Sequence, residues 1–154
     1  MKIGIVVYSQ TGNTFEVAQK LQESLSKAGN SVNIERFNVA NEKERDINKI
    51  QLINAPDISK YDALIFGSPV HAFSLSPAMT AFMSQIPSLE DKKVSCFVTK
   101  GLPLKGTGGN QAISKMKDIC ESKSGDFCGS EILIWNKDRE KQITKLTEEM
   151  CRLF

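Results

Sequence analysis

The strongest constraint on the fold is an uninterrupted apolar run near the start of the chain. Residues Ile3 to Tyr8 read Ile-Gly-Ile-Val-Val-Tyr and are rich in β-branched side chains. A strand that is apolar on both faces is typical of a parallel sheet covered by helices on both sides. The run is far shorter than the roughly 18 apolar residues of a membrane span. It therefore predicts a central buried strand and no membrane segment.

Strands and helices are predicted to alternate along the rest of the chain. After a polar stretch, apolar side chains recur at helical spacing from Val17 to Ala28, and Gly29 and Asn30 end that helix. Further strands are predicted at residues 32–37, 63–66, 94–98 and 131–135. Further helices are predicted around residues 47–53 and at residues 77–86, 110–120 and 137–153. This alternation predicts a three-layer α/β fold with a five-stranded parallel sheet, in a single domain spanning residues 1–154.

Composition argues against several functional classes. Lys and Arg number 20 against 18 Asp and Glu, and no arginine-rich stripe is present. The sequence therefore does not indicate a nucleic-acid-binding surface. The chain starts directly in a strand-like segment without a secretory pattern, and we expect a cytoplasmic protein. A single histidine and cysteines without CxxC spacing do not make a metal site. Free thiols are therefore expected at Cys96, Cys120, Cys128 and Cys151, with a redox role as the alternative.

The first polar stretch lies between the buried strand and the following helix. Ligands of open parallel sheets bind beyond the carboxyl ends of the strands, where strand order reverses. Backbone N–H groups and the helix dipole favour a phosphate at such a helix start. No lysine and no GxxxxGK[ST] pattern occur, so a monophosphate fits better than a triphosphate with magnesium. The candidate ligands are Ser9, Gln10, Thr11, Gly12, Asn13 and Thr14. A plain polar cap built from Asn13 and Glu16 is the alternative.

The polar stretch and the end of the strand before it together resemble a motif of a known family. The segment from Val6 to Thr14 resembles the phosphate loop of the flavodoxin family, whose pattern is Ser/Thr-x-Thr-Gly-x-Thr, and every specified position matches. The resemblance implies FMN as the cofactor. It also implies a flavodoxin-like sheet of order 2-1-3-4-5, with the flavin at the point where the order reverses.

The resemblance extends to a second loop, from Gly67 to Phe73, that is similar to the segment flanking the flavin ring in flavodoxin-like reductases. Its glycine and proline are expected to form a turn near the ring. Either His71 or Phe73 is suited to cover a ring face. A core Phe73 and a solvent-exposed His71 are the alternatives. The implied contacts are Ser68, Pro69, Val70, His71 and Phe73.

A third loop follows the fourth predicted strand, and the family analogy implies that its backbone N–H groups contact the pyrimidine end of the flavin. The implied contacts are Thr99, Lys100, Gly101 and Leu102. The loop has no aromatic side chain, so one flavin face is expected to be more open. Farther on, the segment from Gly106 to Gly109 is either a second anion site or a glycine-rich turn.

Three functions remain open. An FMN-dependent electron carrier with redox partner proteins is preferred, because the chain is small and has no separate nicotinamide domain. An NAD(P)H-dependent reductase of quinones or other small acceptors is the second reading, and a flavin-free partner-binding domain is the third. Because the chemistry would belong to the cofactor, no catalytic acid, base or nucleophile is assigned. Lys100 and Lys105 near the flavin predict a less reducing flavin than in acidic carriers.

Overall fold

The computed structural model describes residues 1–8, 12–71, 74–101 and 108–154. Within these ranges, the parallel strands are β1 (Lys2–Tyr8), β2 (Ser31–Val39), β4 (Ala63–His71), β6 (Lys93–Lys100) and β7 (Asp126–Ile134). Two short antiparallel strands are β3 (Leu52–Ile53) and β5 (Ser74–Leu75). The helices are α1 (Asn13–Lys27), the 3-10 helix η1 (Ile47–Lys49), α2 (Pro77–Ser84), α3 (Gly109–Ser122) and α4 (Arg139–Leu153).

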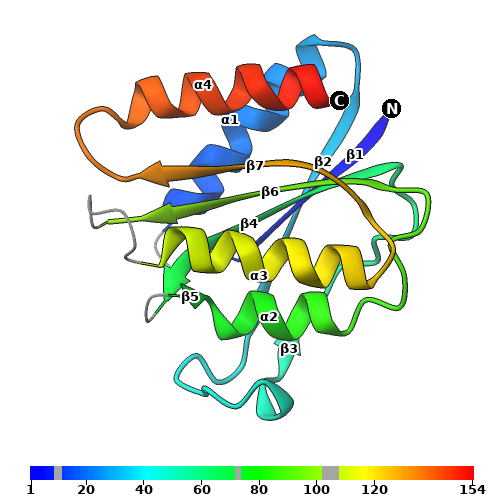
Figure 1. The fold of residues 1–154 in the computed structure, drawn as a ribbon, viewed down its shortest axis with the longest axis vertical. Coiled ribbons are helices and arrows are strands. Elements are labelled where there is room, and N and C mark those ends of the chain that lie inside the picture. Colours follow the sequence, from blue (N-terminus) through cyan, green and yellow to red (C-terminus); the bar gives the residue numbers. More distant parts are fainter. Residues whose placement is uncertain (9–11, 72–73, 102–107) are drawn as a thin grey trace.

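The sheet is covered by helices on both faces. Its order is β3-β2-β1-β4-β6-β7, and β5 pairs with β4 at the end of that strand. Helices α1 and α4 lie on one face, and α2 and α3 lie on the other (Figure 1). The parallel strands follow the predicted 2-1-3-4-5 order, so the three-layer α/β prediction is confirmed. The two antiparallel strands make the sheet larger than the five strands predicted.

Strand β1 shows why both faces are buried. Ile3, Ile5 and Val7 belong to the cluster that contains α1 and α4 side chains, whereas Val6 and Tyr8 belong to the cluster on the opposite face. Successive side chains of a strand point to opposite faces, so a continuous apolar run supplies both clusters at once. The central position predicted for this strand is therefore confirmed.

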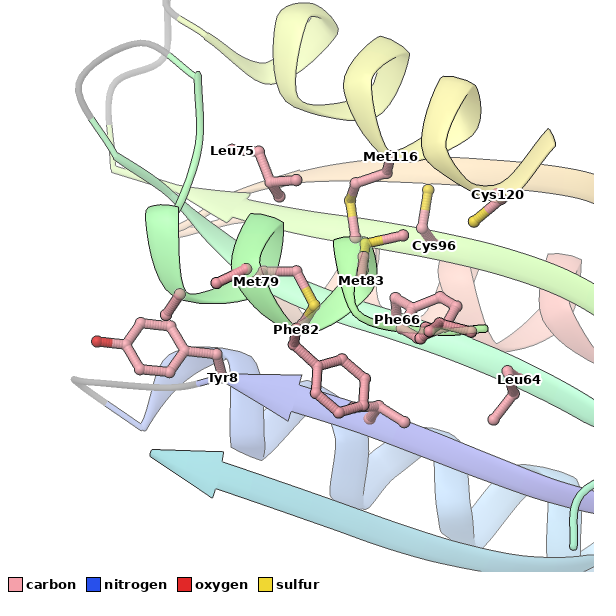
Figure 2. Packing of buried hydrophobic residues seen from close by; sticks show 14 of the residues in the cluster. Tyr8, Leu64, Phe66, Leu75, Met79, Phe82, Met83, Cys96, Met116 and Cys120 are labelled. Carbon is pink, nitrogen blue, oxygen red and sulfur yellow. The ribbon is translucent and has the colours of Figure 1, made fainter. Parts of the chain in front are cut away.

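The core cluster on the α2 and α3 face of the sheet is rich in sulfur-containing side chains. Met79, Met83 and Met116 are fully buried and belong to the same core cluster as Cys96 and Cys120 (Figure 2). The methionine side chains of these two helices therefore face the core. The four cysteines are free, and burial raises the pKa of Cys120 to about 12. A thiol with so high a pKa stays protonated at neutral pH, which argues against redox chemistry at Cys120.

The predicted second helix is wrong. The structure has only the three-residue η1 there, followed by the short strand β3. The three isoleucines that suggested a helix differ in exposure, since Ile50 is buried, Ile47 is half-buried and Ile53 is exposed. Spacing of three residues matches the period of a 3-10 helix, which is rarely longer than three or four residues. The spacing of the isoleucines therefore indicates a single turn of 3-10 helix and not a full α-helix.

The parallel strands are longer than predicted, β4 and β7 most of all. β4 continues from Phe66 to His71 because its residues keep pairing with β6, up to Pro69 opposite Thr99. β6 likewise includes Thr99 and Lys100. β7 begins at Asp126, five residues before its predicted start, and pairs with β6 across a bulge at Val94/Ser95. Glycine and proline in the sequence predicted loops in these places. In the structure, pairing with a neighbouring strand keeps the backbone extended there.

Two negative findings apply to the described ranges. No helix there is both long enough and apolar enough to cross a membrane. Nor do these residues hold any group of three or more His, Cys, Asp or Glu side chains placed to bind a metal ion.

Candidate functional site

The three segments singled out from the sequence begin at one edge of the sheet. Neighbouring parallel strands β1, β4 and β6 end at Tyr8, His71 and Lys100 respectively. Parallel strands bring their carboxyl ends to the same edge, and the arrowheads of β4 and β6 point to the same side in Figure 1. Strand order reverses between β1 and β4, because β2 lies on the far side of β1. A ligand site is expected at such a reversal.

Gly12 forms the N-cap of α1 in a left-handed conformation, with φ of 89°. A side chain there would be strained, although a Cβ at Gly12 would meet nothing within 4 Å. No described side chain caps the helix, and its first backbone bond runs from Glu16 N to Gly12 O at 2.9 Å. The N–H groups of Asn13 and Thr14 therefore precede the first intrahelical bond. Such a helix start, capped by glycine and not by a side chain, fits a phosphate group.

The remaining residues of the first predicted loop, Ser9, Gln10 and Thr11, lie outside the described residues. The Asn13 and Glu16 cap considered from the sequence is not formed, because Asn13 is the first residue of α1 and the cap is Gly12.

A buried hydroxyl pair joins the first and third predicted segments. The Oγ1 atoms of Thr14 and Thr99 lie 2.9 Å apart, and both residues are buried. Thr14 is the second residue of α1, and Thr99 is the next-to-last residue of β6. The hydrogen bond therefore holds the start of α1 against the carboxyl edge of the sheet.

The second predicted loop is largely part of strand β4. Ser68 is fully buried, and its hydroxyl lies 2.8 Å from that of Ser76, which accepts a hydrogen bond from Met79 N and so caps α2. Pro69 and Val70 are half-buried, and Val70 and His71 pair with β5. Phe73 lies outside the described residues. The Ser68 side chain is thus engaged within the protein.

His71 is half-buried at the end of β4 and packs edge-on against Tyr8, with ring centroids 6.3 Å apart. Neither the solvent-exposed alternative nor a fully buried position describes it. Tyr8 was assigned from the sequence only to the core strand. Its ring is nevertheless the aromatic neighbour of His71, a contact that depends on the pairing of β1 with β4.

The neutral form of His71 is favoured by its surroundings. Burial, and secondly the Arg45 guanidinium, lower the pKa of His71 from its ordinary value of 6.5. Since the unfolded chain then takes up a proton before the folded one, stability is expected to fall as pH falls below about 6.5. A ¹H NMR titration of this single histidine should give a midpoint below the midpoint in urea. An equal or higher midpoint in the folded protein would contradict this assignment.

The third predicted segment begins in strand β6. Lys100 is its last residue, and only 9% of it is exposed. A Cβ at Gly109 would lie 3.5 Å from Lys100 Cδ, so the lysine stem runs close to the start of α3. Gly101 follows the strand, and Leu102 lies outside the described residues. Lys100 therefore stands at the carboxyl edge of the sheet, and its contact with the flavin stays a prediction.

Helix α3 begins at the same edge with a second glycine cap. Gly108 has φ of 102°, and no described side chain caps this helix either. Gly106 lies outside the described residues, so the two sequence readings of the segment up to Gly109 stay predictions.

The fold and this edge together define the class of flavodoxin-like α/β proteins. The flavodoxin domain model matches residues 4–126, most of the chain, and the chain therefore belongs to the flavodoxin domain family. The family predicted from the first loop is confirmed. No curated protein sequence matches the chain significantly.

Solved structures agree on the fold. Flavodoxin 2 of Bacillus cereus is 18% identical with a TM-score of 0.72, and each chain is covered completely. The two-electron reduced flavodoxin of Megasphaera elsdenii is 22% identical with a TM-score of 0.71, and covers 97% of this chain and 98% of its own. A Lactobacillus acidophilus flavoprotein in complex with FMN is 18% identical with a TM-score of 0.67, over 94% and 97% of the two chains.

Proposed function

We propose that this chain binds FMN at the carboxyl edge of the sheet and transfers electrons between redox partner proteins, as a single domain spanning residues 1–154. The observation that carries the proposal is the glycine-capped start of α1, directly beyond central strand β1 and beside the reversal of strand order. Family membership supports the same cofactor. When bound, FMN would supply the redox chemistry, and the protein would supply binding, orientation and electrostatics.

Each part of the edge has a proposed role. The segment from Ser9 to Thr14 would hold the phosphate, and the backbone N–H groups of Asn13 and Thr14 would donate to it. The segments around His71 and Gly101 would flank the ring. The Thr14–Thr99 hydrogen bond would keep the phosphate end and the ring end in a constant relation. Lys100 would favour negative charge at the edge, because it is a nearly buried cation there.

A second candidate function is supported by that same lysine. Its positive charge at the carboxyl edge of the sheet attracts a nucleotide phosphate, which favours an NAD(P)H-dependent reductase of quinones or other small acceptors. The carrier and the reductase differ in one property, which is direct reduction by a nicotinamide.

The absorption spectrum of the purified protein with added FMN tests the proposal. We expect the visible bands of a bound oxidised flavin, retained after removal of free FMN. Anaerobic addition of NADPH and NADH should then leave the bands unchanged for a carrier and bleach them for a reductase. A protein that retains no FMN would overturn both functions and leave the flavin-free partner-binding domain.

Replacing Gly12 with alanine is expected to weaken FMN binding about tenfold. At φ of 89° a side chain costs about 1–2 kcal/mol, and the helix start would relax away from the geometry that holds the phosphate. Gly29→Ala is the matched control, since Gly29 has φ of 98° and also has nothing within 4 Å of an added Cβ. It lies beyond the other end of α1. Both variants should lose stability, and only Gly12→Ala should lose FMN affinity in a fluorescence titration. Equal FMN affinities in the two variants would contradict the phosphate site.

A further inference from the structure

A separate cavity lies beside the β4–β5 hairpin. Its volume is about 190 Å³, and its walls come from the segment before η1, from the hairpin, and from helices α2 and α3. β5 lies next to the starts of α2 and α3 (Figure 1). The polar and charged lining residues are Arg45, His71, Ser74, Thr80 and Lys115.

The cavity collects basic groups from three separate parts of the fold. Arg45 comes from the segment between β2 and η1, His71 from β4 and Lys115 from α3. None of the described residues that line it is Asp or Glu. Within the described ranges, neither Arg45 nor Lys115 has a carboxylate oxygen within 4.0 Å. The positive charge of the cavity is therefore not neutralised by a neighbouring side chain there.

The acidic residues nearest to Arg45 in sequence are engaged elsewhere. The Glu44 carboxylate accepts hydrogen bonds from the backbone N–H groups of Arg45 and Asp46, at 3.0 Å and 2.9 Å. The Asp46 carboxylate accepts from Asn48 N at 3.0 Å and caps η1. Both carboxylates are therefore bound to backbone N–H groups of their own segment, residues 44–48.

Arg45 lies close enough to His71 for its guanidinium to contribute to the lowered pKa of His71, after the larger effect of burial. Bringing like charges together is unfavourable, and a bound anion relieves that cost. A neutral imidazole still offers one N–H donor, and Ser74 adds a hydroxyl. Leu75 and Pro77 provide an apolar wall beside these donors.

The size of the cavity limits the ligand. A water molecule occupies about 30 Å³ of liquid, so the cavity holds a group of several heavy atoms. Pockets for whole drug-sized ligands are larger, at roughly 300–1,000 Å³. A phosphate or carboxylate with a short apolar neighbour fits this volume, and a flavin does not.

We propose that the cavity lined by Arg45, His71 and Lys115 binds the phosphate or carboxylate group of a small molecule. The site is distinct from the phosphate loop at the start of α1 and does not depend on FMN. Arg45 and Lys115 supply the charge. His71 lines the cavity and is also the last residue of β4, at the carboxyl edge of the sheet. A small acidic molecule bound there would sit next to the segment proposed to flank the flavin.

His71 provides a direct readout, because it is the only histidine in the chain. The FMN-saturated protein, or the chain as purified if it takes no FMN, is titrated separately with inorganic phosphate and with succinate. The pH is held constant, and ionic strength is balanced with NaCl. The His71 ring resonances are followed by ¹H NMR. We expect a saturating shift with at least one anion, and the tighter one identifies the ligand as a phosphate or a carboxylate.

Two double variants decide whether the anion occupies this cavity. Arg45→Gln/Lys115→Gln should weaken the binding by about tenfold or more, because two charged hydrogen-bond donors are removed. Lys43→Gln/Lys117→Gln removes the same charge from the same two segments at exposed residues that do not line the cavity, and binding should stay within about twofold. Absence of saturation with both anions, or an equal loss in the two double variants, would overturn the proposal.

Discussion

Gly67→Ala is expected to lower the free energy of unfolding by about 1–3 kcal/mol, as is typical when a packed core is overfilled. A Cβ at Gly67 would lie 2.3 Å from Phe97 Cζ and within 2.9 Å of two further ring atoms. Real Cβ contacts are essentially never so short, so the ring or the strand must move. Phe97 is fully buried in the cluster of α1 and α4, which leaves it little room. Urea denaturation measures the loss.

Gly101→Ala is the matched control for this prediction. Gly101 lies beyond the end of the neighbouring strand, has no positive φ, and nothing lies within 4 Å of a Cβ built there. Its substitution should change stability by less than about 0.5 kcal/mol. Phe97→Leu in the Gly67→Ala background should restore part of the loss, giving a coupling energy of about 1 kcal/mol in a double-mutant cycle. Equal stabilities of the two alanine variants would refute the packing explanation.

Lys100→Gln is expected to lower the reduction potential of the bound flavin by about 40–90 mV. One unit charge at roughly 8 Å, with an effective dielectric of about 20–40, contributes about 1–2 kcal/mol. For a one-electron step that free energy corresponds to the stated range. Lys100 is nearly buried, so solvent screens its charge less than that of a surface lysine. A redox titration of the holoprotein measures the shift.

Lys93→Gln is the control on the same strand. Lys93 is the exposed first residue of β6, whereas Lys100 is the last. Seven residues of strand separate them, or about 23 Å, which exceeds the screening length at physiological salt. The control should therefore change the potential by only a few millivolts. An unchanged potential in Lys100→Gln would show that this lysine does not act on the flavin.

The secondary structure was predictable where its signal is local. The apolar run of β1 and the helical spacing of α1, α3 and α4 were sufficient to locate those elements within a few residues. The errors occurred where pairing with a neighbour overrides local preference. Gly67 and Pro69 are turn-like residues, yet both lie in β4, because β6 supplies a partner for each. The second helix failed because three isoleucines at a spacing of three specify only one 3-10 turn.

The candidate site, like the secondary structure, was predictable only in its local features. The family pattern from Ser9 to Thr14 is contiguous, so the sequence alone was sufficient to identify the family and to predict the fold. The hydrogen bond between Thr14 and Thr99, the fit of Gly67 against Phe97 and the meeting of Arg45 with His71 and Lys115 were decided only by the tertiary structure. Each joins residues that are distant along the chain, and no local periodicity encodes which side chains will meet once the sheet and helices pack.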